Sequence, residues 1–85
     1  MTRRKLFQRL QRGSLSNVPF PDFRNLMRGF GFRLVRVTGS HFLYAHPGVA
    51  ELINLQEKDG EAKPYQIRQF LQIVERYNLA MEDDR

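Results

Sequence analysis

Apolar residues recur at helical spacing between residues 23 and 30. The face they predict consists of Phe23, Leu26, Met27 and Phe30. Proline is favoured in the first turn of a helix, and glycine is favoured just after the last turn. We therefore expect a helix that starts at Pro21 or Asp22 and ends at Gly29 or Gly31.

A second apolar face marks the clearest helix of the sequence. It is made of Ile67, Phe70, Leu71, Val74 and Tyr77. Pro64 falls in the first turn of this helix, where its missing N–H costs no hydrogen bond. The spacing predicts a long amphipathic helix that packs its apolar face against the rest of the domain.

Between these two helices the pattern changes to that of extended chain. Strands are predicted over residues 32–37, 42–46 and 52–56, where apolar and polar residues mix and turn residues separate the segments. Gly39-Ser40 is typical of a tight hairpin turn. The predicted fold class is α+β, with the order helix, three-stranded antiparallel sheet, helix. The two helices should cover one face of the sheet and leave the other face to water or a ligand.

An additional basic helix is predicted at the start of the chain. Thr2 is a suitable N-cap and Gly13 a suitable stop. Leu6, Phe7 and Leu10 form a narrow apolar stripe, so this helix should either dock on the domain or remain frayed. We accordingly expect a basic N-terminal arm over residues 1–16, the domain over 17–80 and a flexible tail over 81–85.

Charge is distributed unevenly along the 85 residues. The first 48 residues contain nine arginines and lysines against one acid, a net charge of +8, whereas the remainder carries −3. Arginine dominates, and its planar guanidinium can bind phosphate through two hydrogen bonds at once. A basic half of this kind favours nucleic acid as a partner. A basic surface that only keeps the protein soluble is the alternative reading.

Several classes of protein do not fit the composition. The chain has no cysteine, which excludes disulfides, zinc ribbons and thiol chemistry. No apolar run approaches the roughly 18 residues of a membrane span, and the basic N-terminus does not resemble a secretory signal. We expect a cytoplasmic protein that needs no cofactor and does not enter the membrane.

The chain contains two histidines, and they are the only residues suited to proton transfer near neutral pH. His41 follows the predicted Gly39-Ser40 turn, at the rim of the sheet. His46 is five positions further on, so in one unbroken strand the two side chains point to opposite faces. Only one of them can then serve a given site. We favour His41, which could move protons on a phosphodiester; His46 precedes a proline and is expected to cap the strand end.

Candidate phosphate ligands surround His41 in the sequence. Arg33 and Arg36 are three positions apart on the predicted first strand, so alternation places them on opposite faces, and the pattern does not decide which face is buried. Arg36 is nearer the turn and is the preferred contact. Further candidates are Ser40, Arg28 at the end of the first core helix, and Lys63 at the start of the last one, where helix amides also favour anions.

The string Gly31-Phe32-Arg33-Leu34-Val35-Arg36-Val37-Thr38-Gly39-Ser40-His41, followed by His46-Pro47, resembles the signature of the HicA (YcfA-like) mRNA-interferase toxins. The resemblance extends over roughly residues 20–79. It implies a double-stranded-RNA-binding-like fold and a ribonuclease that cleaves mRNA with one histidine, here His41, in place of a metal. It also implies neutralisation by a HicB-like antitoxin protein. Many members carry a second histidine where this chain has Phe42.

Two functions of different classes therefore remain open. The chain is either a metal-independent endoribonuclease held inactive by an antitoxin, or a non-catalytic RNA-binding module of the same fold. An adaptor that binds an acidic protein through its basic surface is a third possibility. The position of His41 after a glycine turn is the feature that favours the enzyme.

Overall fold

The structure, a computed structural model, describes residues 1–82 and contains helices and strands in the predicted order. Its elements are α1 (Arg3–Gln11), α2 (Phe20–Gly29), β1 (Arg33–Thr38), β2 (His41–Ala45), β3 (Ile53–Lys58), β4 (Glu61–Ala62) and α3 (Pro64–Arg76). All neighbouring strands are antiparallel, and their order in the sheet is β1-β2-β3-β4. The α+β class predicted from the sequence is therefore confirmed.

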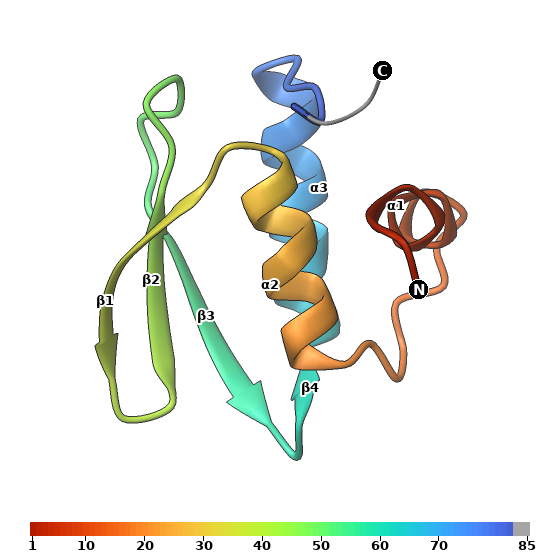
Figure 1. Ribbon diagram of the computed structural model, residues 1–85, viewed down its shortest axis with the longest axis horizontal. Coiled ribbons are helices and arrows are strands. Elements are labelled where there is room, and N and C mark those ends of the chain that lie inside the picture. The colour runs from red at the N-terminus through yellow and green to blue at the C-terminus, as the bar shows by residue number, and fades with distance from the viewer. Residues whose placement is uncertain (83–85) are drawn as a thin grey trace.

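The described part of the chain forms three layers, as Figure 1 shows. The sheet lies on one side, α2 and α3 lie next to it, and α1 lies beyond them on the side away from the sheet. Phenylalanine rings pack the two helices together and onto the sheet: the Phe70 ring of α3 is 5.3 Å from that of Phe23, 5.5 Å from that of Phe30 and 5.9 Å from that of Phe32, which precedes β1. Edge-to-face pairs of this kind add to the burial of the rings themselves. The two helices thus cover only one face of the sheet.

The sheet has four strands, so the prediction of three was wrong. The additional strand, β4, is two residues long, and Glu61 and Ala62 pair with the end of β3. A segment before α2 then pairs with the outer side of β4: the Ala62 amide donates to the Val18 carbonyl at 2.9 Å, and the Phe20 amide donates to the Gly60 carbonyl at 2.8 Å. A two-residue strand is too short to show the alternation by which strands are recognised in a sequence.

One buried side chain continues the pairing where β4 is missing. Gln66 of α3 is only 5% exposed. Its Oε1 accepts a hydrogen bond from the Gln56 amide at 2.9 Å, and its Nε2 donates to the Asn54 carbonyl at 2.9 Å. Backbone groups of a buried strand must find partners. The Gln66 amide therefore replaces a neighbouring strand along the middle of β3.

The helix ends follow the local signals in the sequence. The Thr2 hydroxyl accepts a hydrogen bond from the Lys5 amide at 3.1 Å, which confirms the predicted N-cap. Gly31, with a φ of +92°, follows α2, and the Phe32 amide donates to the Met27 carbonyl across it at 3.1 Å. This is the Schellman arrangement, which needs a left-handed residue. Of the two glycines considered, Gly31 is the one that reverses the chain.

The basic N-terminal helix is docked on the domain. Leu6 and Leu10 are almost completely buried and belong to the same apolar cluster as the residues of α2 and α3, and the Phe7 ring lies 4.9 Å from that of Phe30. At the other end of the chain, Met81 packs against this cluster and the Glu82 amide donates to the Gly29 carbonyl at 2.7 Å. The rest of the tail predicted to be flexible, residues 83–85, lies outside the described residues.

Candidate active site on the open face of the sheet

A two-residue hairpin turn places His41 at the end of the sheet. Gly39 has a φ of +62°, which suits a short hairpin loop, and Thr38 pairs directly with His41 across the turn. His41 is exposed and begins β2. His41 is therefore the first residue of a strand and directly follows a two-residue turn, and the pairing across that turn holds its backbone in place.

The two faces of β2 have different surroundings. Tyr44 is buried under the helices, where its hydroxyl accepts a hydrogen bond from Arg24 at 2.7 Å, and the Phe42 ring packs 5.0 Å from that of Phe20. Side chains alternate along a strand. His41 and Leu43 consequently project from the opposite, open face of the sheet.

The neighbouring strand β3 contributes two polar side chains to the same open face. Asn54 pairs with Leu43, and Gln56 pairs with His41. Directly opposite residues on neighbouring strands share a face and lie close together. The open face thus carries a row formed by Thr38, His41 and Gln56 and a second row formed by Arg36, Leu43 and Asn54.

A β-bulge in β1 decides the position of the arginines. Arg36 pairs with Leu43, whereas Arg33 pairs with Ala45, and the register shifts between Leu34 and Arg36. Leu43 and Ala45 are on the same face of β2, so both arginines lie on the open face although they are three positions apart. The expectation of opposite faces was wrong, because Val35 is inserted as an extra residue that leaves the alternation of β1 out of step.

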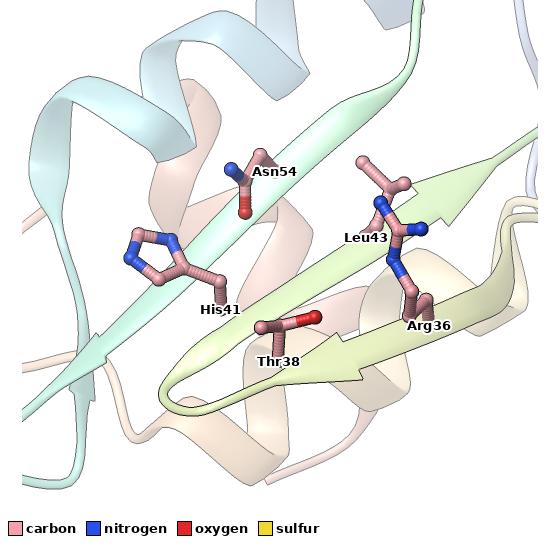
Figure 2. A pocket seen from close by; sticks show the side chains of 5 residues that line it. All are labelled: Arg36, Thr38, His41, Leu43 and Asn54. Atoms are coloured by element: carbon pink, nitrogen blue, oxygen red, sulfur yellow. The ribbon is translucent and has the colours of Figure 1, made fainter.

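The open face contains a hollow of about 320 Å³, shown in Figure 2. It is lined by Arg36, Thr38, His41, Leu43 and Asn54. The side chains of Arg36 and Leu43 lie next to each other at one end of the hollow, and that of His41 lies at the other end. Among the described residues, no hydrogen-bond partner holds the His41 imidazole, so both of its ring nitrogens can meet a ligand. The hollow combines an accessible imidazole with a guanidinium and no acidic side chain.

The other predicted ligands differ in how close they come to this hollow. Lys63 precedes α3 and donates from Nζ to Gln56 Oε1 at 2.7 Å, which places its ammonium beside the partner of His41. Ser40 lies in the hairpin turn, where its carbonyl accepts from the Glu57 amide at 3.2 Å. Arg28 belongs to the last turn of α2 and is therefore on the side of the sheet that the helices cover.

Sequence reasoning missed three residues that line the hollow. Leu43 shares the parity of His41, and Thr38 faces His41 once the turn is known to have two residues. Asn54 lies between the apolar residues Ile53 and Leu55, and a polar residue in this position indicates the solvent-facing side of a strand. The registers of the three strands were needed to bring these side chains together.

Within the described residues 1–82, no group of three or more histidine, cysteine, aspartate or glutamate side chains is arranged to hold a metal ion. The second histidine of the chain, His46, lies against Phe32 on the other side of the sheet from the hollow. The hollow itself offers a ligand one imidazole and the Arg36 guanidinium, while Arg33 lies further along the same face and the Lys63 ammonium is beside Gln56. These groups suit an anionic ligand that also has a proton to exchange.

None of the helices in the part of the chain that the structure describes is long and apolar enough to cross a membrane. Comparison of the chain with known protein families, curated proteins and solved structures found no match.

Proposed function

We propose that this protein is the toxin of a toxin–antitoxin pair, a metal-independent endoribonuclease that cleaves mRNA with His41 as its catalytic residue. The observation that carries the proposal is the common position of His41 and Arg36 in one hollow on the open face of the sheet. The resemblance of residues 20–79 to HicA toxins supports the same reading, and the order α2, β1 to β3, α3 is compatible with the double-stranded-RNA-binding-like fold of that family.

The arrangement of charge on the open face fits an RNA backbone. Arg36 and Arg33 follow one another along β1, separated by the bulge, and Lys63 lies at the other side of the His41 row. Phosphate contacts from arginine and lysine provide most of the affinity of proteins that bind nucleic acids with little sequence preference. A strand of RNA laid across the hollow would bring a phosphodiester between the cations and the imidazole.

His41 can serve there as a general base. Its unprotonated ring nitrogen takes the proton of the ribose 2′-hydroxyl, and the O2′–P bond forms while the P–O5′ bond breaks. The products are a 2′,3′-cyclic phosphate and a 5′-hydroxyl, whose oxygen takes its proton from water. The Arg36 guanidinium stabilises the negative charge that develops on the phosphorane oxygens. The step needs no oxidant, reductant or metal ion.

A toxin of this kind is paired with a protein that neutralises it. The resemblance implies a HicB-like antitoxin in the cytoplasm, and the net charge of +8 in the first 48 residues favours a partner with an acidic surface. Complementary charge speeds association and makes its rate depend on salt. A neighbouring gene that encodes a small antitoxin-like protein would support this assignment.

The alternative is a non-catalytic RNA-binding module. It is favoured by one observation: the His41 imidazole has no described partner that orients it, and an exposed histidine can contact RNA without transferring a proton. The two functions share the basic open face and differ only in whether RNA is cut.

The experiment compares purified wild-type protein with His41→Ala on a 5′-labelled RNA, with and without EDTA. We expect the wild type to cleave in both conditions, to leave a cyclic phosphate, and to arrest growth when produced alone. His41→Ala should bind RNA with nearly unchanged affinity, keep its circular dichroism, and cleave nothing. Binding without cleavage by the wild type would instead establish the RNA-binding module. Cleavage lost in EDTA and restored by magnesium would refute the metal-independent mechanism.

A further inference from the structure

The two edges of the sheet are treated differently by the rest of the chain. On the β3 and β4 side, the backbone of β3 pairs with β4 and with the side-chain amide of Gln66. The outer side of β4 pairs with the segment Val18–Phe20. On the other side, within residues 1–82, β1 is the last strand and nothing pairs with its outer edge. An open edge of this length is a template for another strand.

The hydrogen-bonding groups of β1 that point outward can be identified from the register. The Glu57 amide donates to the Ser40 carbonyl, so the backbone hydrogen-bonding groups of Ser40 point toward β3. Along a strand these groups point alternately to one neighbouring strand and to the other, so the N–H and C=O groups of Phe42 and Tyr44 also point toward β3. Their partners on β1, Val37 and Leu34, consequently direct their own N–H and C=O groups away from β2.

The side chains along this edge sort by face. Leu34 and Val37 pair with Tyr44 and Phe42 and therefore lie on the helix side. They are nevertheless 42% and 48% exposed, since β1 is the edge strand and lies farthest from α2 and α3 in Figure 1. Val35, in the bulge, is 59% exposed. Apolar residues gathered along an unpaired edge differ from the scattered exposed ones that need no explanation. A strand placed here could bury apolar side chains on the helix side of the sheet.

The other face of the same edge is cationic. Arg33 and Arg36 both project from the open face, and neither pairs with an acid in the sheet, since Ala45 and Leu43 are their neighbours on β2. Opposite charges on neighbouring strands stabilise the pair, and like charges placed opposite each other destabilise it. The strand that fits β1 therefore carries acidic side chains on its open-face side.

A second copy of this chain fits poorly. Pairing β1 with β1 of another copy, in any antiparallel register that covers most of the strand, would place the arginines of one copy beside those of the other on a single face. The apolar residues would match, but the charges would repel. The charge pattern thus selects a partner of different sequence.

We propose that β1 accepts an added strand from a protein partner, in a segment whose residues alternate between apolar and acidic. Main-chain hydrogen bonds to Leu34 and Val37 supply the attachment, and the alternating side chains supply the specificity, as in other cases of strand addition to a sheet edge. This inference goes beyond the proposed ribonuclease activity and does not depend on it, because it concerns the edge of the sheet and requires no cleavage.

The test is a titration of ¹⁵N-labelled full-length protein with a capped peptide of about seven residues that alternates glutamate and valine, a length that covers a strand of this size. Hydrogen exchange of the Leu34 and Val37 amides should slow about ten-fold or more at saturation, because a bonded amide exchanges only when the pair opens. The matched controls are a lysine–valine peptide of equal length and two N-methylated forms of the glutamate peptide, methylated at one or the other alternating set of residues. The lysine peptide should not slow the exchange of these amides. Of the two methylated glutamate peptides, one should slow it as the unmethylated peptide does and the other should not.

Other outcomes would overturn the proposal. Chemical shifts at the arginines without slower exchange at Leu34 and Val37, or equal effects of both methylated peptides, would mean a contact through charge alone. Protection that grows with protein concentration in the absence of peptide, together with dimers in sedimentation, would assign the edge to a second copy. Equal protection of these amides by an RNA oligonucleotide would assign it to nucleic acid, and an unperturbed spectrum at millimolar peptide would refute strand addition.

Discussion

The ring of His46 joins the end of β2 to the end of α2 through the carbonyl of Phe30, which lies 3.0 Å from its Nε2. The opposite ring nitrogen, Nδ1, accepts a hydrogen bond from the Gly48 amide at 2.9 Å. A carbonyl can only accept and a backbone amide can only donate, so the proton of this neutral imidazole is on Nε2. The ring also packs 5.0 Å from that of Phe32, as expected for a histidine with a role in the fold.

The first prediction contrasts the two histidines. His46→Ala should lower the free energy of unfolding by about 2–3 kcal/mol, because it removes two hydrogen bonds to backbone groups and a packed ring. His41→Ala should change it by less than about 0.5 kcal/mol, since His41 is exposed. Urea unfolding of both variants measures the difference. Similar losses for the two would show that His41 has a structural role that its exposure does not indicate.

The second prediction concerns the bulge in β1. Deleting Val35 should leave the fold intact, because Leu34 and Arg36 would become regular neighbours and keep their partners Tyr44 and Leu43. Stability should change by no more than about 1 kcal/mol, and RNA affinity by less than about three-fold, since both arginines stay on the open face. The matched control is deletion of Leu43, which disturbs the ladders on both sides of β2 and should prevent folding. Amide spectra and urea unfolding distinguish the two; a Val35 deletion as damaging as the control would contradict the bulge.

The third prediction concerns the side chain that replaces a strand. Gln66→Ala should lower the free energy of unfolding by about 2–3 kcal/mol, because the buried Gln66 side chain is lost and the Gln56 amide and the Asn54 carbonyl lose their partners in a partly buried position. Gln69→Ala, an exposed change on the same helix, should be nearly neutral. Hydrogen exchange should become faster at the Gln56 amide in the first variant alone. An unchanged exchange rate there would contradict the proposed pairing.

The fourth prediction concerns phosphate contacts. Arg36→Ala should weaken binding to RNAs of different sequence alike, by about 1 kcal/mol, and reduce the slope of affinity against salt by about one unit. Arg12→Ala removes the same charge at the exposed end of α1, which α2 and α3 separate from the sheet. It should change RNA affinity by less than about two-fold. Filter binding over a range of salt concentrations measures both. A change in which RNAs are bound, in place of a uniform loss, would mean that Arg36 contacts bases.

The fifth prediction concerns the loop between β2 and β3, which is tied to the end of α3. The Tyr77 hydroxyl donates to the Glu51 carboxylate, and Arg76 forms an ion pair with it. The pKa of Glu51 is lowered, chiefly by the Tyr77 hydrogen bond and in lesser part by Arg76. A lowered folded-state pKa stabilises the fold above the pKa of the unfolded chain, and this contribution is lost as the pH falls through the lowered value.

The measurement for this loop is a carboxyl titration by NMR. Tyr77→Phe should raise the pKa of Glu51 back toward its ordinary value and reduce the loss of stability on acidification. Glu51→Gln should remove this part of the pH dependence altogether. A Glu51 pKa that does not move in Tyr77→Phe would mean that the hydroxyl does not hold the carboxylate in solution.

Local signals were sufficient for the helices and the hairpin. Thr2, Gly13 and Pro64 begin or end helices because their own side chains and backbone preferences act within one turn of where they stand. The Gly39-Ser40 turn likewise depends on adjacent residues, and it puts His41 at the rim of the sheet as predicted. The odd separation of five residues puts His46 on the other face, also as predicted. Interactions between residues so close together in the chain can be predicted from the sequence alone.

The face occupied by the arginines was a matter for the tertiary structure. Arg33 and Arg36 are three apart, and regular alternation separates them, yet the bulge at Val35 brings them together on the open face. The sequence shows no sign of the bulge, since an extra residue in one strand is defined only against the strand that pairs with it. The sequence supplied the arginines, and the register with β2 supplied their common surface.

The closure of one sheet edge was equally beyond the sequence pattern. Gln66 stands in an amphipathic helix where a polar residue would be expected to face water, and β4 has only two residues. Gln66 is buried because β3 presents backbone groups that need partners, 10 and 12 residues away along the chain. The short β4 pairs with the end of β3 across a tight turn. Sequence alone determined the helices, the first three strands and the place of His41 directly after the hairpin turn. Which faces meet and which edge stays open was decided only when those segments packed, because each unpaired backbone group takes its partner from whatever the fold brings beside it.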